Sequence, residues 1–208
     1  SGSPGRRRER GSNLEHRIDQ VVCRRVGMME YVALLRGINV GGKNKVVMSE
    51  LREQIACEGF VEVRSYINSG NLVFIADATH EEVARSVESV LDRYYSFPIR
   101  LALLSGQEYL MELSDLPHWW HGDAARRDVL FYTRGLEQDH VRERIEAMVL
   151  GDESVHFGKH AVFWAKFDEA SFLKTAYHKY LMREDFYRQV TIRSGATVER
   201  IAAMLSRD

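Results

Sequence analysis

The feature that most constrains this 208-residue chain is an apolar run that ends abruptly in a polar, glycine-rich loop. The run covers Tyr31–Leu35, and residues 36–45 that follow read RGINVGGKNK. A short apolar run bounded in this way is typical of a buried strand, and closely spaced glycines let a backbone turn tightly and approach a ligand. We therefore expect a strand whose carboxyl end opens into a loop built for polar contact.

After this loop, helical and strand patterns alternate. Helices are predicted over Met48–Glu58, with Leu51 and Ile55 inward and Gly59 as the stop, and after the capping box Thr79–Glu82, with Val83, Val87, Val90, Leu91 and Tyr94 inward. Strands are predicted over Val61–Ile67, Leu72–Ile75 and Ile99–Leu104, the first two joined by the tight turn 68–71. The order is βαββαβ, the unit of ferredoxin-like folds.

The same order returns after a connecting segment in which only Gln107–Leu113 has a helical pattern. Strands are predicted over Val129–Thr133, Val155–Phe157, Ala161–Phe167 and Gln189–Arg193. Helices are predicted over Gln138–Val149 (Val141, Ile145, Met148 and Val149 inward), Ser171–Met182 and Thr197–Leu205. We predict an α+β fold of two successive ferredoxin-like βαββαβ units with a closing C-terminal helix.

The predicted organisation has four parts. Residues 28–105 form the first half with the glycine loop, 106–127 connect, and 128–208 form the second half plus the closing helix. Residues 1–27 are interpreted as a leader, either disordered or carrying a short helix over Ser12–Val22. The leader holds seven arginines against three acids, whereas the body from Met28 holds 22 cations against 27 acids. A body of that sign does not favour a nucleic acid as partner.

The topology brings two polar turns together. The loop after the first strand and the turn between the second and third strands leave such a sheet at the same edge, so backbone N–H groups and cations should surround one spot, as in an anion site. The predicted ligand-binding residues are Arg36, Gly37, Asn39, Gly41, Gly42, Lys43, Asn44, Lys45, Asn68, Ser69 and Asn71. The alternative is that Asn and Gly merely form turns while the lysines solvate a loop.

Three segments resemble a known bacterial family. LRGINVGGKNKVVMSEL from Leu35, YINSGNLVF from Tyr66 and VTIRSGATVERI from Val190 are similar to the family called domain of unknown function 1697. The resemblance implies two ferredoxin-like halves and implies no activity. Family members usually carry Arg-Asn-Trp where this chain has Arg193-Ser194-Gly195, so two side chains of that tripeptide differ here.

Other motifs in the sequence give weaker support for a function. Residues 37–43 nearly spell a P-loop, but Asn44 replaces the hydroxyl that holds Mg²⁺, and the helix begins too late to aim its dipole into the loop. His118, His121, His156 and His160 lack the spacing of a recognised metal site, so no metal and no cofactor is expected. The tryptophans beside His118 and His121 are expected to pack between the halves. Ser69, the one serine at the predicted site, has no predicted base beside it.

The sequence thus favours a protein that binds a small anionic ligand at the glycine loop, with phosphate-bearing molecules among the candidates. Two alternatives stay open: an enzyme that positions a phosphorylated or carboxylated substrate there, and a protein-interaction module without a ligand. Two lone cysteines, Cys23 and Cys57, and no run of about 20 apolar residues point to a cytoplasmic protein without a membrane partner. The oligomeric state is not determined by the sequence.

Overall fold

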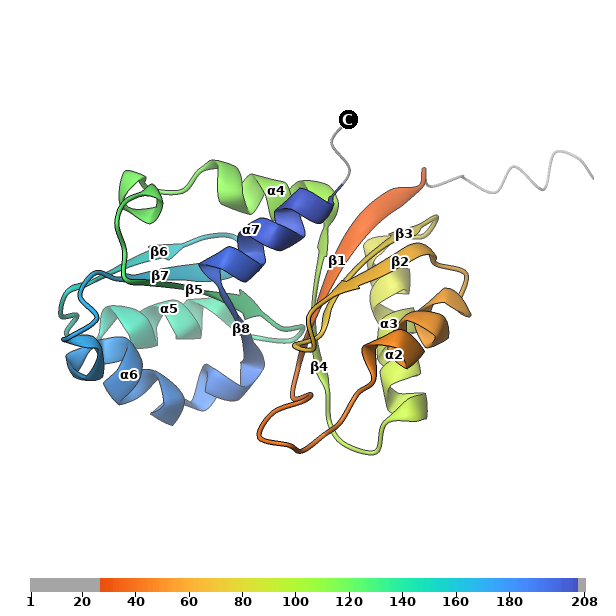
Figure 1. Cartoon of the computed structure of the whole chain (residues 1–208), viewed down its shortest axis with the longest axis horizontal. Helices are drawn as coiled ribbons and strands as arrows, with labels where there is room; N and C mark the ends of the chain where they lie inside the picture. The colour runs from red at the N-terminus through yellow and green to blue at the C-terminus, as the bar shows by residue number, and fades with distance from the viewer. Residues whose placement is uncertain (1–26, 206–208) are drawn as a thin grey trace, which may run out of the picture.

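A computed structural model describes residues 27–205 of the chain. The helix considered over Ser12–Val22 and the leader that contains it lie outside the described residues. Two four-stranded antiparallel sheets make up the fold, in the orders β2-β3-β1-β4 and β6-β7-β5-β8 (Figure 1). Both orders are those of the ferredoxin-like unit, so the predicted α+β class is confirmed, with α7 as the closing helix.

The first half follows the predicted order. Its strands are β1 (Met29–Arg36), β2 (Val61–Tyr66), β3 (Asn71–Ala76) and β4 (Arg100–Ser105), and its helices are α2 (Met48–Ala56) and α3 (His80–Tyr94). Thr79 and Glu82 form the predicted capping box at the start of α3. One inward residue was predicted wrongly: Tyr94 is 50% exposed, because it is the last residue of α3, whose inward contacts end with Leu91.

The connecting segment and the second half complete the fold. The elements are α4 (Gly106–Ser114), the short 3₁₀ helix η2 (His118–His121), β5 (Arg126–Tyr132), α5 (Gln138–Glu146), β6 (Glu153–Phe157), β7 (Ala161–Lys166), β8 (Val190–Ser194) and α7 (Gly195–Met204). Because α5 ends at Glu146, the prediction that Val149 faces inward is wrong, and this side chain is 86% exposed.

The helix predicted over Ser171–Met182 is also wrong. The chain instead forms the short helices η3 (Phe172–Lys174), α6 (Ala176–Tyr180) and η4 (Leu181–Arg183), followed by η5 (Asp185–Gln189). The break falls at Thr175, which is extended (ψ 150°) and caps α6 by accepting the N–H of His178. The buried Glu153 carboxylate accepts the N–H groups of Ala176 and Tyr177, so a partner distant in sequence fixes this break.

Both faces of the first sheet are buried. Tyr31, Ala33 and Leu35 of β1 pack with α2 and α3, and the alternate residues Val32 and Leu34 belong to a second core. This second core also takes in the facing side of the second sheet together with α4 and α7. A third core joins the far face of the second sheet to α5 and the short helices. The continuous apolar run of β1 thus reflects a strand covered on both sides.

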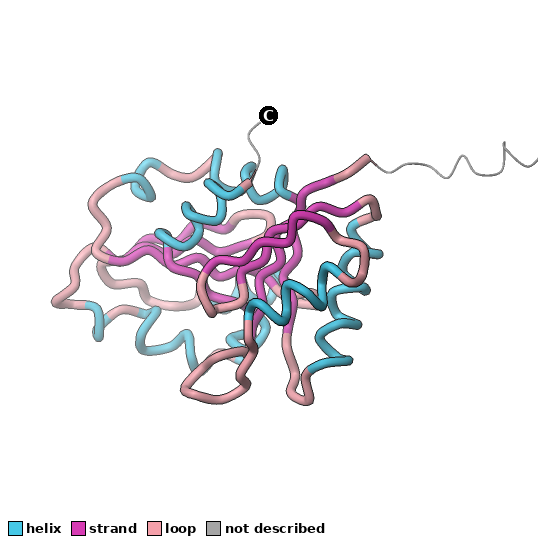
Figure 2. The backbone as a smooth tube through the Cα atoms, turned by 45° about the vertical axis from the view of Figure 1, so that its right-hand side comes forward, coloured by secondary structure: helices cyan, strands magenta, loops and turns pink. Residues whose placement is uncertain are grey.

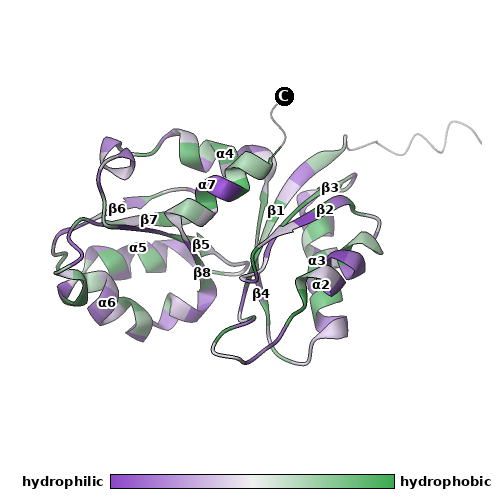
Figure 3. Ribbon diagram, viewed as in Figure 1, coloured by the Kyte–Doolittle hydropathy of each residue, from purple (hydrophilic) through white to green (hydrophobic). Residues whose placement is uncertain are grey.

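The arrangement is visible in the pictures. Helices α4 and α7 lie together along the top of the two sheets in Figure 1, and the turned view of Figure 2 shows the strands of both halves gathered in the middle. In Figure 3, α2 and α7 carry both purple and green segments, as expected for helices with one face on a core. The loop between β1 and α2 projects from the end of the first sheet opposite α4 and α7.

Candidate functional site

The glycine loop between β1 and α2 is a small hairpin. Lys43 N–H donates to the Val40 carbonyl oxygen at 3.0 Å, which closes a turn whose tip is Gly41–Gly42. Both tip glycines have positive φ (57° and 74°), as in the two-residue turns that favour glycine. Gly37 also has positive φ (95°), and a Cβ there would lie 3.0 Å from the Pro98 carbonyl oxygen. The backbone conformation therefore accounts for glycine at all three positions, independently of any ligand.

Two asparagines brace the base of this hairpin. Asn44 Nδ2 donates to the Gly37 carbonyl oxygen at 2.8 Å. The Asn39 side chain donates to the carbonyl oxygens of Val46 and Asn68, and it accepts the Val46 N–H. The 2.8 Å bond to Asn68 joins the loop to the β2–β3 turn, so the two polar turns do converge at one edge of the sheet.

Asn71 is a buried residue at the same edge of the sheet. Its side chain is 1% exposed, and its amide donates to the Tyr66 carbonyl oxygen and to Ser69 Oγ, both at 2.9 Å. Its Oδ1 accepts a bond from Arg193 Nε, on β8 of the second half. A side chain buried and bonded in this way positions the turn, and the exposed part of the site lies elsewhere.

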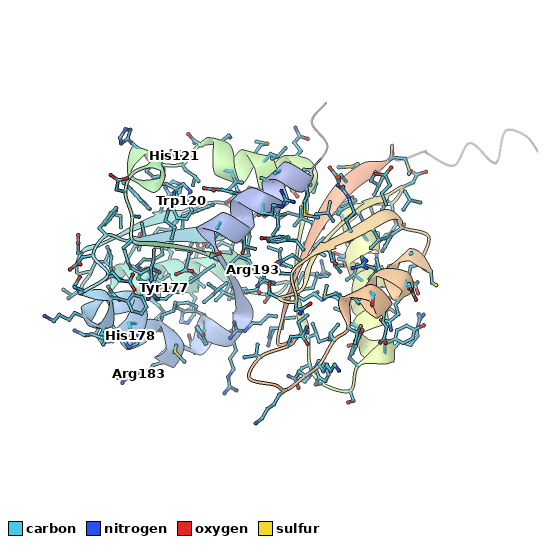
Figure 4. The ribbon with its side chains drawn as sticks, viewed as in Figure 1. Trp120, His121, Tyr177, His178, Arg183 and Arg193 are labelled. Atoms are coloured by element: carbon cyan, nitrogen blue, oxygen red, sulfur yellow. The ribbon has the colours of Figure 1, made fainter. Side chains whose placement is uncertain are left out.

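Arg193 is one of the residues that join the two halves at this edge, and Figure 4 shows it between them. Only 6% of the residue is exposed. Its guanidinium donates to the carbonyl oxygens of Leu35 and Ser69 at 2.8 and 2.7 Å, and to Thr191 Oγ1 within its own strand. Burial lowers the pKa of Arg193 to about 10, so the group stays charged at neutral pH.

The contacts of Arg193 were missed by sequence reasoning because they span more than a hundred residues. The one available signal was the family tripeptide, of which this chain keeps the arginine. Ser194 caps α7 by accepting the Thr197 N–H. A Cβ on Gly195 would lie 3.1 Å from Arg127 Cβ and 3.7 Å from the Trp120 ring, so little room exists there for a larger side chain.

The predicted site residue Arg36 faces the second half. Its guanidinium donates to the Val190 carbonyl oxygen at 2.8 Å and lies 4.7 Å from the centroid of the Tyr187 ring. Thr191 Oγ1 adds a bond to the Leu35 carbonyl oxygen. Arg36 therefore helps to dock the halves, and its charge sits at the margin of the loop.

The exposed part of the site is the tip of the hairpin, residues 40–45. Lys43 and Lys45 make no side-chain hydrogen bond or ion pair with any described residue, and the same holds for Arg100, which pairs across the sheet with Arg36. No carboxylate occurs between Arg36 and Glu50 in the sequence. Open space surrounds Gly41 and Gly42. The tip thus presents positive charge and unobstructed backbone to solvent.

Neither a histidine nor a carboxylate is hydrogen-bonded to Asn39 or Ser69 within residues 27–205. The same range contains no group of three or more His, Cys, Asp or Glu residues placed to hold a metal ion. His118 and His121 are exposed, while Trp120 is buried in the core between the sheets (Figure 4). No helix in the described part of the chain is long and apolar enough to cross a membrane.

The comparisons with known proteins agree with the predicted family. A solved structure described as that of the conserved bacterial protein SP0830 from Streptococcus pneumoniae is similar, with a TM-score of 0.84 and 47% identity; the match covers 86% of this chain and 100% of that one. No curated protein matches. The sequence profile of the family described as "Protein of unknown function (DUF1697)" matches residues 28–163, well over half of the chain, and the chain therefore belongs to the DUF1697 family.

Proposed function

We propose that the exposed tip of the glycine loop binds a small anion, such as a phosphate or carboxylate group on a metabolite. The observation that carries the proposal is the open Gly41–Gly42 turn, followed by two lysines whose ammonium groups have no partner among the described residues. Backbone N–H groups and cations that face solvent together favour negative charge.

The bracing around the tip supports this proposal. Asn39, Asn44 and Asn68 hold the hairpin, and Arg193 and Asn71 hold the neighbouring turn. A loop that is already ordered loses less conformational freedom when a ligand binds. We assign ligand contact to Gly41, Gly42, Lys43 and Lys45, and positioning to Arg36, Gly37, Asn39, Asn44, Asn68, Ser69 and Asn71.

We propose binding in preference to turnover. An enzyme at this loop would need a general base within hydrogen-bond reach of the reacting group, and among the described residues neither a histidine nor a carboxylate is hydrogen-bonded to Asn39 or Ser69. We also propose a cytoplasmic setting, because Cys57 is an exposed free thiol of the kind that persists in reducing compartments.

Calorimetric titration of the full chain with inorganic phosphate at low salt tests the proposal. Lys43→Ala should weaken binding by a factor of about 2–5, as expected for a solvent-exposed charge pair. The matched control is Lys179→Ala, which removes another exposed lysine, on α6. Equal losses in the two variants would show only a nonspecific effect of net charge.

Two substitutions of Gly42 separate the contribution of the turn amides to binding from that of the lysine charges. Gly42 has φ of 74°, which a β-branched side chain avoids and asparagine tolerates. Gly42→Val should abolish phosphate binding and Gly42→Asn should keep it. Nothing packs at this position, so the valine variant should melt only slightly below the asparagine variant, by the difference in backbone strain. Full binding by Gly42→Val would contradict a role for the turn amides.

A further inference from the structure

A second surface lies at the other end of the first sheet, around the outward side of α4. A groove of about 880 Å³ runs between the start of β1, the end of α7 and α4. A pocket of about 550 Å³ lies on the other side of α4, against the β6–β7 hairpin. Met111 and Ser114 line both hollows, so the two form one continuous surface, here called the α4 surface.

The α4 surface exposes large apolar side chains. Leu110 is 40% exposed, Met111 62% and Met28 60%. Methionine side chains are flexible and polarizable, and they adapt to different apolar partners. An exposed apolar strip beside a groove is a common mark of a protein-binding site.

The charges around this strip are mostly negative. The residues that line the two hollows include four carboxylates, Glu30, Glu108, Glu112 and Asp115, and one lysine, Lys159. Glu30 is paired with Arg64, and Glu112 accepts the N–H groups of Lys159 and His160. Glu108 caps α4 by accepting the Ser105 N–H and is partly exposed, whereas Asp115 is exposed and carries the charge most open to a partner. An apolar strip with an acidic rim is complementary to an apolar helix with a basic rim.

We propose that the α4 surface binds an amphipathic, lysine- or arginine-rich helix of a partner protein. The apolar side of such a helix would cover Leu110 and Met111, and its cations would lie beside Glu108 and Asp115. This site is separate from the glycine loop. Met29 and Arg36 stand at opposite ends of β1, about 23 Å apart for an eight-residue strand.

Fluorescence anisotropy with two labelled peptides tests the proposal on the full chain. One peptide is an amphipathic helix of leucine and lysine, and the other has glutamate in place of every lysine. The lysine peptide should bind, more weakly as salt is added, and the glutamate peptide should not. Equal binding of the two peptides, or none of either, would overturn the proposal.

Substitutions test whether the lysine peptide binds at the α4 surface. Leu110→Gln combined with Met111→Gln should weaken binding of the lysine peptide about tenfold or more, and Asp115→Asn should reduce its salt dependence. Met182→Gln is the matched control, since Met182 is 70% exposed on η4, away from the α4 surface. All these side chains are exposed, so melting temperatures should stay close to that of the unchanged protein. An equal loss in Met182→Gln would rule out the assigned surface.

Two further outcomes would identify a different occupant. Self-association of the full chain that Met111→Gln abolishes would show that a second copy of this chain covers the surface. The second outcome concerns a chain that lacks residues 1–26. If it binds the lysine peptide far more tightly than the full chain, then residues 1–26 cover the α4 surface in the full chain. Either result contradicts a partner protein.

Discussion

Arg193, on the last strand of the second half, donates a buried hydrogen bond to the side-chain oxygen of Asn71, the first residue of β3 in the first half. The same guanidinium bonds the carbonyl oxygens of Leu35 and Ser69, at the end of β1 and in the adjoining turn. One side chain thus fixes the edge of the sheet from which the glycine loop projects, and it ties that edge to the other half.

Replacement of Arg193 by lysine should be strongly destabilising. A lysine keeps the charge but lacks the planar fork that reaches several acceptors at once, so buried carbonyl oxygens would lose their partners. We expect a loss of about 3–5 kcal/mol in the free energy of unfolding, measured with urea. Arg188→Lys, at an exposed position on η5, is the control and should change it by less than about 0.5 kcal/mol. A similarly small loss at position 193 would mean that these bonds contribute little.

A pair of glycines tests the close contact beneath the β2–β3 turn. Gly70 has φ of 82°, and a Cβ there would lie 2.8 Å from Leu35 Cβ and 2.8 Å from Ile38 Cδ1. Gly59 has a similar φ of 91° with nothing within 4 Å. Gly59→Ala should cost about 1 kcal/mol for backbone strain alone. Gly70→Ala should lower the stability clearly more, as measured by thermal unfolding. Equal losses in the two variants would show that the turn adjusts to the added Cβ without strain.

The architecture could be read from the sequence because its signals are local. The capping box at Thr79–Glu82 and the turn before Asn71 each depend on neighbours within a few residues, and both occur as predicted. The break at Thr175 could not be read, because it depends on Glu153, more than twenty residues away. The convergence of the loop and the turn followed from strand order alone, since strand order decides which loops share an edge.

The contacts within the candidate site could be predicted from the sequence only in part. The sequence placed Asn71 beside the loop but could not show that its side chain is buried and bonded to Arg193. Nor could it show that Arg36 turns toward Tyr187. Both are long-range contacts between the halves, and no periodic pattern in the sequence encodes how two separate sheets pack.

Glu112 gives the protein a pH dependence of stability that can be isolated. Burial raises the pKa of its carboxyl, although the N–H groups of His160 and Lys159 oppose the shift. The folded state then binds more protons than the unfolded state between the two pKa values, so stability falls as the pH rises through that interval. Glu112→Gln removes this titration and leaves that of the neighbouring His160.

The measurement is the difference in the free energy of unfolding between the original protein and Glu112→Gln at several pH values. This difference should shift in favour of the original protein as the pH is lowered below neutral. The pKa of His160 is lowered by burial, which gives stability an opposite slope, but this slope is present in both proteins and cancels. A difference that is independent of pH would mean that Glu112 titrates normally in the folded state.

The most direct test of anion binding is a nuclear magnetic resonance titration of the nitrogen-15-labelled full chain with inorganic phosphate. The amide signals of Gly41, Gly42 and Lys43 should shift together and saturate, and Lys43→Ala should weaken this response while Lys179→Ala leaves it intact. Shifts that stay unsaturated, or that are spread over exposed lysines such as Lys179 and absent from Gly41 and Gly42, would contradict an anion site at the glycine loop.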